Sequence, residues 1–330
     1  MPKKDFFIKK SITFSFIIII IIYTIAFFTG FFTVKLLYGA GEIYDAYGGI
    51  HLLLVFFVAD IITTTVVWIF GIIFNNSSVY DPYWSVAPVA IIVSWIIIKQ
   101  QTESLSNSNL SAIEILFLLA IVIWGMRLTV NWAIRWKGLN HQDWRYIMLK
   151  TRSPKMWFLT NLAGINMMPT IIVYFALTPA FFGVFNELFN RAEFLTVSLS
   201  RLNSERVLPS WITMAGFIIC ILSVVIAAIS DIQLDNFRKK SKNHIDRGIW
   251  RYSRHPNYFG EVSFWWGIWL MQFGVAPNIW VTVIGPVLMT ILFVFVSIPM
   301  MEKHIILSKP SYKDYKKRVS MLIPWFRFRQ

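Results

Sequence analysis

VSFWWGIWLMQFGVAPNIWVTVIGPVLMTILFVFVSIPMM, residues 262–301, contains no charged side chain over 40 positions. About 20 apolar residues cross the hydrocarbon core of a bilayer, so this run is long enough for two crossings. Residues 11–34 and 207–230 are further uncharged apolar runs. The whole chain of 330 residues is 56% hydrophobic and only 15% charged, and its mean hydropathy is +0.59. This composition excludes an ordinary soluble protein and indicates a multi-pass membrane protein.

The apolar runs predict an all-α fold, a polytopic bundle of about eight transmembrane helices, with seven to ten possible. Residues 156–185 carry Pro169 and Pro179, so they form either one kinked span or a broken hairpin. We expect one integral-membrane domain over residues 1–330, in which 1–49 add an accessory first span and loop to a core at 50–330. The expected spans are 12–32, 50–74, 84–98, 113–134, 156–185, 211–231, 257–273 and 279–299.

The basic residues of the chain are unevenly distributed between the segments that join the expected spans. With the N-terminus in the cytoplasm, 26 of the 31 Lys and Arg residues fall on the cytoplasmic side. The positive-inside rule therefore predicts that both termini are cytoplasmic. It also explains the net charge of +14 without nucleic acid. The single cysteine, Cys220, excludes an intramolecular disulfide and a cysteine metal cluster, and no metal site is expected.

The stretch just before residues 262–301 concentrates reactive side chains. Trp250–Glu261 reads WRYSRHPNYFGE, where a basic loop meets an apolar segment. Pro256 suits the first turn of a helix with His255 as its cap, so the free N–H groups of that turn would face the cytoplasm. Arginines beside a helix N-terminus form an anion site, although topology alone also explains them.

Two further residues extend this polar face into the membrane. Asn257 and Glu261 are four positions apart and share a helix face, and Gly260 would allow a bulky group to approach the backbone. A carboxylate about one turn inside a membrane helix is costly unless it is paired or faces a polar cavity. Glu261 therefore has either a function or a structural ion pair.

A second group of polar residues follows the apolar run that begins near residue 50. Asp60 should lie near mid-membrane, where it must be neutral, paired or in contact with a cavity. Tyr80 and Tyr83 come soon after this span. They are either ligand-binding residues or part of an interfacial aromatic belt.

Two more basic segments complete the cytoplasmic surface. Residues 127–155 contain Arg145 and could help to enclose a polyanionic cofactor, or they could attract anionic lipid headgroups. The C-terminal tail contains Tyr315 within a basic and aromatic sequence. Such a tail lies on the membrane surface or closes over a cofactor.

The residues quoted above carry a resemblance to a known family. RGIWRYSRHPNYFGE at 247–261, SVYDPYWSVAP at 78–88 and GLNHQDWRY at 138–146 resemble the uncharacterised membrane branch of the steroid 5-alpha reductase superfamily. The wider superfamily includes sterol reductases and, more remotely, isoprenylcysteine carboxyl methyltransferases. The resemblance implies a helical membrane fold in which about residues 231–330 hold NADPH from the cytoplasmic side. The cofactor residues it suggests, with those from the basic segments, are Arg145, Arg238, Arg251, Ser253, Arg254, His255, Asn257, Tyr258, Glu261 and Tyr315.

The implied activity is an NADPH-dependent reduction of a carbon–carbon double bond in a lipophilic, enone-type or sterol-like substrate that enters from the bilayer. Hydride transfer to an enone builds negative charge on its carbonyl oxygen, which a nearby acid must stabilise. Asp60, Tyr80, Tyr83 and Glu261 are the candidate catalytic residues. The alternatives are an S-adenosylmethionine-dependent methyltransferase of a prenylated or lipid substrate, and a non-catalytic lipid-binding protein. Arginines favour the phosphates of NADPH, whereas carboxylates and aromatic faces favour the sulfonium of S-adenosylmethionine.

Overall fold

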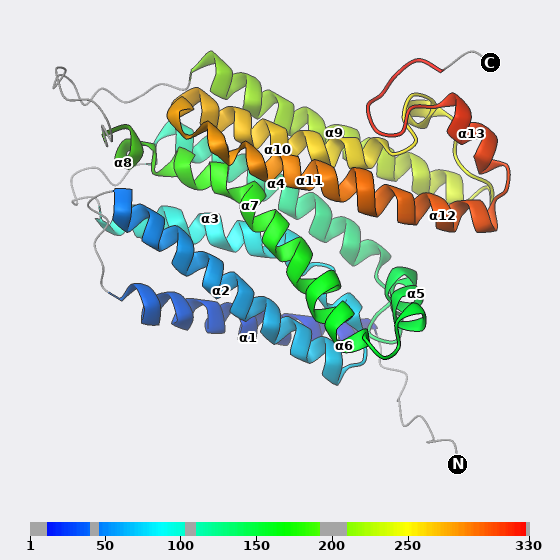
Figure 1. The fold of residues 1–330 in the computed structure, drawn as a ribbon, viewed down its shortest axis with the longest axis horizontal. Coiled ribbons are helices and arrows are strands. Elements are labelled where there is room, and N and C mark those ends of the chain that lie inside the picture. Colours follow the sequence, from blue (N-terminus) through cyan, green and yellow to red (C-terminus); the bar gives the residue numbers. More distant parts are fainter. Residues whose placement is uncertain (1–11, 40–45, 103–109, 192–209, 328–330) are drawn as a thin grey trace. The chain divides into compact units, whose positions relative to one another are not determined.

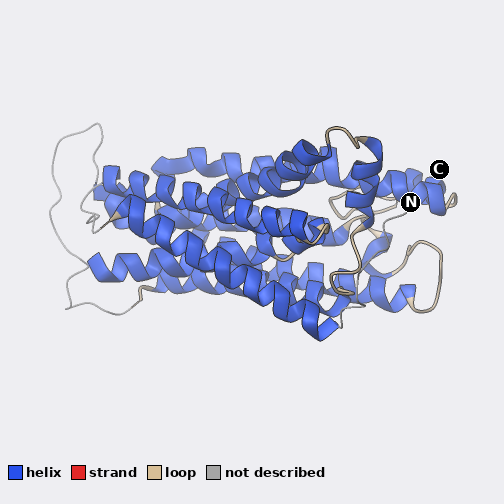
Figure 2. Ribbon diagram, turned by 90° about the horizontal axis from the view of Figure 1, so that it is seen from below, coloured by secondary structure: helices blue, strands red, loops and turns tan. Residues whose placement is uncertain are grey.

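The computed structural model describes residues 12–39, 46–102, 110–191 and 210–327. Helices joined by short loops make up this part of the chain, together with an isolated β-bridge between Ser253 and Ser320 (Figure 2). The all-α fold is therefore confirmed for the described residues. The helices of the first half are α1 (Ile12–Tyr38), α2 (Ala46–Ile73), η1 (Ser77–Tyr80), α3 (Tyr83–Thr102), α4 (Ala112–Arg135), α5 (Trp144–Arg152), α6 (Trp157–Leu159), η2 (Thr160–Met167) and α7 (Met168–Val184).

The second half begins with the short helix α8 and continues to the C-terminal tail (Figure 1). Its elements are α8 (Asn186–Arg191), α9 (Trp211–Arg238), η3 (Gly248–Arg251), α10 (Pro256–Val275), η4 (Pro277–Val283), α11 (Ile284–Ile291), η5 (Leu292–Ser297), α12 (Ile298–Ser308) and α13 (Tyr312–Arg318).

Seven helical segments of the described chain are long and apolar enough to cross a membrane. This number lies within the predicted range, and both the third and the last segment are longer than expected. The helix α10 matches the expected span at 257–273 but is not one of the seven. Its sequence is interrupted by the polar residues Asn257, Glu261 and Gln272, all of which lie in a helix of 20 residues. The side of the membrane on which each terminus lies stays a prediction.

The proline-containing segment is one span. Residues Trp157–Val184 form a continuous helical segment, with a π-helical stretch at Thr160–Met167 just before Pro169. The side chain of Asn166 donates hydrogen bonds to the main-chain and side-chain oxygens of Asn161, at 2.7 and 3.1 Å. A polar side chain thus adds a hydrogen bond to a main-chain carbonyl oxygen within the irregular turn. Of the two sequence alternatives, the hairpin is wrong.

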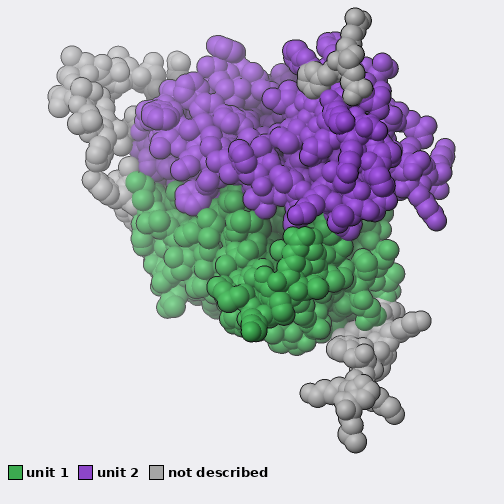
Figure 3. All heavy atoms as spheres, turned by 45° about the vertical axis from the view of Figure 1, so that its right-hand side comes forward, with its two compact units in different colours: residues 1–108, 125–174 green, residues 109–124, 175–330 purple. Residues whose placement is uncertain are grey.

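The chain divides into two compact units, coloured green and purple in Figure 3. Unit 1 comprises residues 1–108 and 125–174, and unit 2 comprises residues 109–124 and 175–330. In unit 1, α1 packs along α2, and η1 packs against both α2 and the start of α3. The prediction of a single domain with an accessory first span stays a prediction.

In unit 2, α9 and α10 lie side by side along their length (Figure 1). Small residues make this contact possible, because a Cβ atom on Gly260 would lie 2.6 Å from the carbonyl oxygen of Ser223. A Cβ atom on Gly216 would lie equally close to the backbone nitrogen of Met271. Membrane helices approach this closely through small residues, because lipid supplies no hydrophobic force between them. The bulky group expected to approach Gly260 is therefore the backbone of α9.

Candidate functional site

The site begins at the amino end of α10, where the chain turns from the loop into the helix. His255 has non-helical backbone angles and Pro256 occupies the first helical position, as the sequence predicts. The side chain of His255 forms no capping hydrogen bond to the first turn of this helix. The first N–H groups of a helix have no partner within the helix and carry partial positive charge. The amino end of α10 is therefore able to accept an anionic or carbonyl group.

Glu302 of α12 is the centre of a buried network beside this helix end. This residue is only 2% exposed. Its Oε1 atom accepts from Arg254 Nε at 2.6 Å, from His255 Nε2 at 3.2 Å and from the Tyr312 hydroxyl at 3.3 Å. Its Oε2 atom pairs with Lys316 Nζ at 2.7 Å. A buried carboxylate needs such partners, because its desolvation would otherwise cost several kcal/mol.

The guanidinium of Arg254 ties the C-terminal tail to the start of α10. Besides Glu302, it donates from Nη1 to the carbonyl oxygens of Lys316 and Val319, at 2.7 and 2.8 Å. Arg254 is 8% exposed. The charge of this arginine is thus balanced within the protein, whereas the sequence suggests that it faces a cofactor phosphate.

The neighbouring residues of the 250–255 segment hold the same tail. Ser253 donates its hydroxyl to Leu322 O at 2.7 Å, and its backbone forms the bridge to Ser320. Tyr315 is buried and donates to the carbonyl oxygens of Trp250 and Ser253. Ser253 and Tyr315 therefore position the tail against the start of α10.

The imidazole of His255 lies between the Glu302 network and an aromatic ring. Its ring is parallel to that of Tyr258, with centroids 5.4 Å apart. Burial lowers the pKa of His255 below 6.5, and although Glu302 opposes this effect, Arg254 and Lys316 add to it. A neutral imidazole with hydrogen on Nε2 fits this position, because two cations already balance the one carboxylate.

A pH dependence of stability follows from the lowered pKa of His255. Below pH 6.5 the unfolded chain binds a proton that the folded protein resists, so stability falls until the folded-state pKa is reached. Above pH 6.5 both states are neutral and the histidine contributes no pH dependence. We expect the wild-type melting temperature to fall more steeply than that of His255→Gln between about pH 7 and about pH 5. Parallel melting curves for the two proteins would contradict a neutral buried His255.

Asn257 and Glu261 continue the site along α10, as predicted from their spacing. The Oδ1 atom of Asn257 is buried and has no hydrogen-bond partner within the described residues. Glu261 is buried and accepts from Trp124 Nε1 at 2.8 Å. The Trp124 ring in turn stacks on Phe264, with centroids 5.2 Å apart. Asn257 is thus the member of this face that lacks a partner for a buried polar atom.

The other predicted cofactor residues lie at different places. Arg251 and Arg238 are exposed in unit 2, at the end of η3 and the end of α9. Arg145 belongs to unit 1, where it binds Asp143 through Nε at 2.8 Å and through Nη2 at 3.1 Å. Burial alone would raise the pKa of Asp143, but these bonds from Arg145 lower it.

The candidate catalytic residues also divide between the units. Asp60, Tyr80 and Tyr83 come together in unit 1, where the Tyr83 hydroxyl donates to Asp60 Oδ1 at 2.6 Å. The Tyr80 and Tyr83 rings are 5.6 Å apart, but the Tyr80 hydroxyl bonds Thr170 at 2.8 Å. Glu261 belongs to unit 2.

Two partners in the site are not predicted by the sequence analysis. Glu302 partners Arg254, and Trp124 partners Glu261. One signal for Glu302 is present in the sequence, since it is the first charged residue after the uncharged run 262–301. A carboxylate there requires a cation. Nothing in the sequence distinguishes Trp124 from the other tryptophans.

Comparison with known proteins gives a family and one relative. A family model described as "Protein of unknown function (DUF1295)" matches residues 67–319. Methanethiol S-methyltransferase 1 of Bradyrhizobium diazoefficiens is 36% identical over 80 residues, which are 24% of this chain and 25% of that protein. The similarity thus spans about a quarter of the relative. No solved structure matches.

Proposed function

The chain belongs to the family of proteins of unknown function DUF1295, and we propose that it is a membrane methyltransferase that uses S-adenosylmethionine. The acceptor is a lipophilic molecule with a nucleophilic atom. The amino end of α10 is the cofactor site. The methyltransferase name of the relative supports this reaction class. This name favours the methyltransferase, which the sequence left as an alternative, over the NADPH-dependent reductase. The comparisons show no steroid reductase family.

The observation that carries the proposal is the charge balance beside α10. NADPH has several phosphate charges and calls for open arginines. Arg254, the arginine next to the helix end, instead donates hydrogen bonds from Nε to Glu302 and from Nη1 to two carbonyl oxygens of the tail. A ligand with one carboxylate and one sulfonium needs fewer cations than NADPH does.

The residues present fit S-adenosylmethionine in three respects. The first turn of α10, which the His255 side chain does not cap, is able to receive a carboxylate. The parallel rings of His255 and Tyr258 offer aromatic faces, which attract a sulfonium cation. The buried Oδ1 of Asn257 is able to accept a hydrogen bond from an amino group.

When bound, the cofactor supplies a methyl group on a positively charged sulfur. The chain itself supplies binding and orientation. A neutral His255 adds no positive charge that would repel the sulfonium. The Glu302 network fixes His255 and the tail, and the Trp124 hydrogen bond fixes Glu261. These contacts hold the polar side chains of α10 in place before any ligand binds.

A thermal-shift experiment tests the proposal on the purified full-length protein in detergent. We expect S-adenosylmethionine and S-adenosylhomocysteine to raise the melting temperature more than NADPH or NADH. The substitution Asn257→Ala should weaken S-adenosylmethionine binding about tenfold, because a buried hydrogen bond is lost. Asn236→Ala is the matched control, since Asn236 is exposed on α9.

The opposite pattern would contradict the methyltransferase. If NADPH alone stabilises the protein, and Asn257→Ala abolishes this stabilisation, the amino end of α10 is the NADPH site of a reductase. If Asn257→Ala and Asn236→Ala weaken S-adenosylmethionine binding equally, the cofactor does not bind at the amino end of α10.

A further inference from the structure

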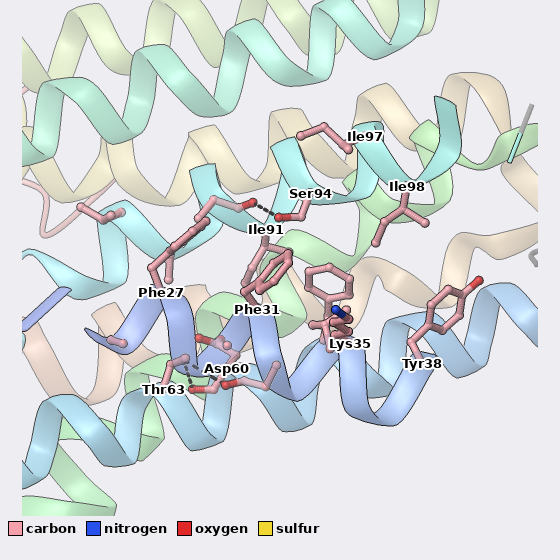
Figure 4. A pocket seen from close by; sticks show the side chains of 18 of the residues that line it. Phe27, Phe31, Lys35, Tyr38, Asp60, Thr63, Ile91, Ser94, Ile97 and Ile98 are labelled. Carbon is pink, nitrogen blue, oxygen red and sulfur yellow. Dashed lines mark hydrogen bonds between the residues drawn. The ribbon is translucent and has the colours of Figure 1, made fainter. Parts of the chain in front are cut away.

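Unit 1 contains a cavity of about 610 Å³ that is separate from the residues assigned above to the cofactor. Its lining comes from α1, α2 and α3 (Figure 4). The volume lies within the range of about 300–1,000 Å³ that is typical of small-molecule sites. Small residues on the three helices leave this space: Ala26, Gly30, Ala59, Ala87 and Ala90.

The cavity is long and mostly apolar. Its lining extends along α3 from Tyr83 to Gln101, which corresponds to about 27 Å of helix. Phe27 and Phe31 of α1 line it and point towards α3 in Figure 4. Both phenylalanines are more than half exposed. In a membrane protein such an apolar side faces lipid, so a lipophilic molecule would reach the cavity from the bilayer.

The lining is polar at two places. Lys35, Tyr38 and Gln101 line the cavity near the ends of α1 and α3, and Asp60, Thr63 and Tyr83 line the end beside the start of α3. The Tyr83 hydroxyl donates its hydrogen to Asp60 Oδ1 at 2.6 Å. The Thr63 hydroxyl also contacts Tyr83, and it lies 3.0 and 2.9 Å from the carbonyl oxygens of Ala59 and Asp60. The hydroxyl hydrogens at this end therefore already have acceptors.

The carboxylate of Asp60 is left with capacity to accept. Within the described residues, Asp60 Oδ2 has no hydrogen-bond donor, and Asp60 forms no ion pair. Lys35 also lines the cavity, but within the described residues it forms no ion pair with Asp60. A carboxylate in a membrane span requires a partner or a polar cavity. A ligand that donates a hydrogen bond would supply that partner.

We propose that this cavity binds a single-chain lipophile whose head group donates a hydrogen bond to Asp60, an alcohol or a protonated amine. The chain occupies the apolar length beside α3, and the head lies at Asp60 and Tyr83. An enone would need the opposite kind of site, because its carbonyl oxygen accepts hydrogen bonds and requires a donor. The proposal concerns unit 1 alone and does not depend on the cofactor.

Photo-crosslinking in lipid nanodiscs tests the cavity with the full-length protein. The probe is a farnesol analogue that carries a diazirine on its chain, and the crosslinked peptides are identified by mass spectrometry. We expect crosslinks on α1 and α3. Unlabelled farnesol or farnesylamine should compete about tenfold more strongly than farnesyl methyl ether, which only accepts hydrogen bonds.

Two substitutions and one control separate the apolar length from the polar end. Ala90→Phe should abolish crosslinking by filling the cavity, whereas Val93→Phe on the lipid-exposed side of the same helix should leave it unchanged. Asp60→Asn conserves the shape but adds a donor, so it should remove the preference for farnesol over its methyl ether. Melting temperatures of all three variants establish that they are folded.

Three outcomes would overturn the proposal. The first is equal competition by farnesol, farnesylamine and the methyl ether, which is expected if a bilayer acyl chain fills the space. The second is stronger competition by farnesyl acetone, a ketone, which would show that the polar end donates. The third is an unchanged crosslinking yield in folded Ala90→Phe. A failure of S-adenosylmethionine to bind would leave these results unaffected, so the two proposals fail separately.

Discussion

Glu302→Ala is expected to destabilise unit 2 by about 3–5 kcal/mol, because it leaves the buried guanidinium of Arg254 without its anion. The same substitution removes the acceptor of His255 and the partner of Lys316. The tail should then detach from the 250–255 segment. Unfolding in mixed detergent and SDS micelles measures the loss of stability, and limited proteolysis after residue 308 measures release of the tail.

The matched control is Lys316→Ala. Lys316 also pairs with Glu302, but its side chain is 46% exposed. Solvent screens such a pair, so we expect a loss below about 1 kcal/mol. The double variant Arg254→Met with Glu302→Leu should recover much of the stability, since it removes both buried charges together. If Glu302→Ala costs no more than Lys316→Ala, the buried network does not hold the tail.

Gly260→Val is expected to separate α9 from α10, with a cost of about 3 kcal/mol or more. Its Cβ atom would lie 2.6 Å from Ser223 O and 2.8 Å from Ala227 Cβ. The first of these atoms belongs to the backbone of α9, so no side-chain rotation relieves the clash. Asn257 and Glu261 flank Gly260 on α10, so their positions should shift with the helix. The melting temperature measures the destabilisation, and S-adenosylmethionine binding measures the displacement of the site.

Gly164→Ala provides the control for backbone flexibility. Among the described residues, and apart from the nearby backbone of its own helix, no atom lies within 4 Å of a Cβ atom built at Gly164. Replacing this helical glycine should leave stability unchanged or raise it by about 0.5–1 kcal/mol, because alanine loses less entropy on folding. A similar loss in both variants would mean that glycine flexibility, and not helix contact, matters at Gly260.

The sequence explained the surroundings of Asp60 only in part. The position of Asp60 in an apolar run predicted that it would be neutral, paired or in contact with a cavity, and the structure places it in the lining of one. Its hydrogen-bond partner Tyr83 is 23 positions away, beyond the end of α2. In that bond the Tyr83 hydroxyl donates its hydrogen to Asp60. We therefore infer a ligand that donates a hydrogen bond, and not an enone that accepts one.

The sequence by itself determined the all-α membrane architecture, because about 20 apolar residues and internally satisfied backbone groups leave few alternatives in a bilayer. It also predicted the start of α10 at Pro256 and the shared face of Asn257 and Glu261, since both depend on local helix geometry. Tertiary structure decided which charges remain available. Arg254 is balanced by Glu302, which is 48 positions away, and Glu261 bonds Trp124, which is 137 positions away. Local periodicity contains no information about such distant pairs, whose burial fixes the charge that a ligand meets.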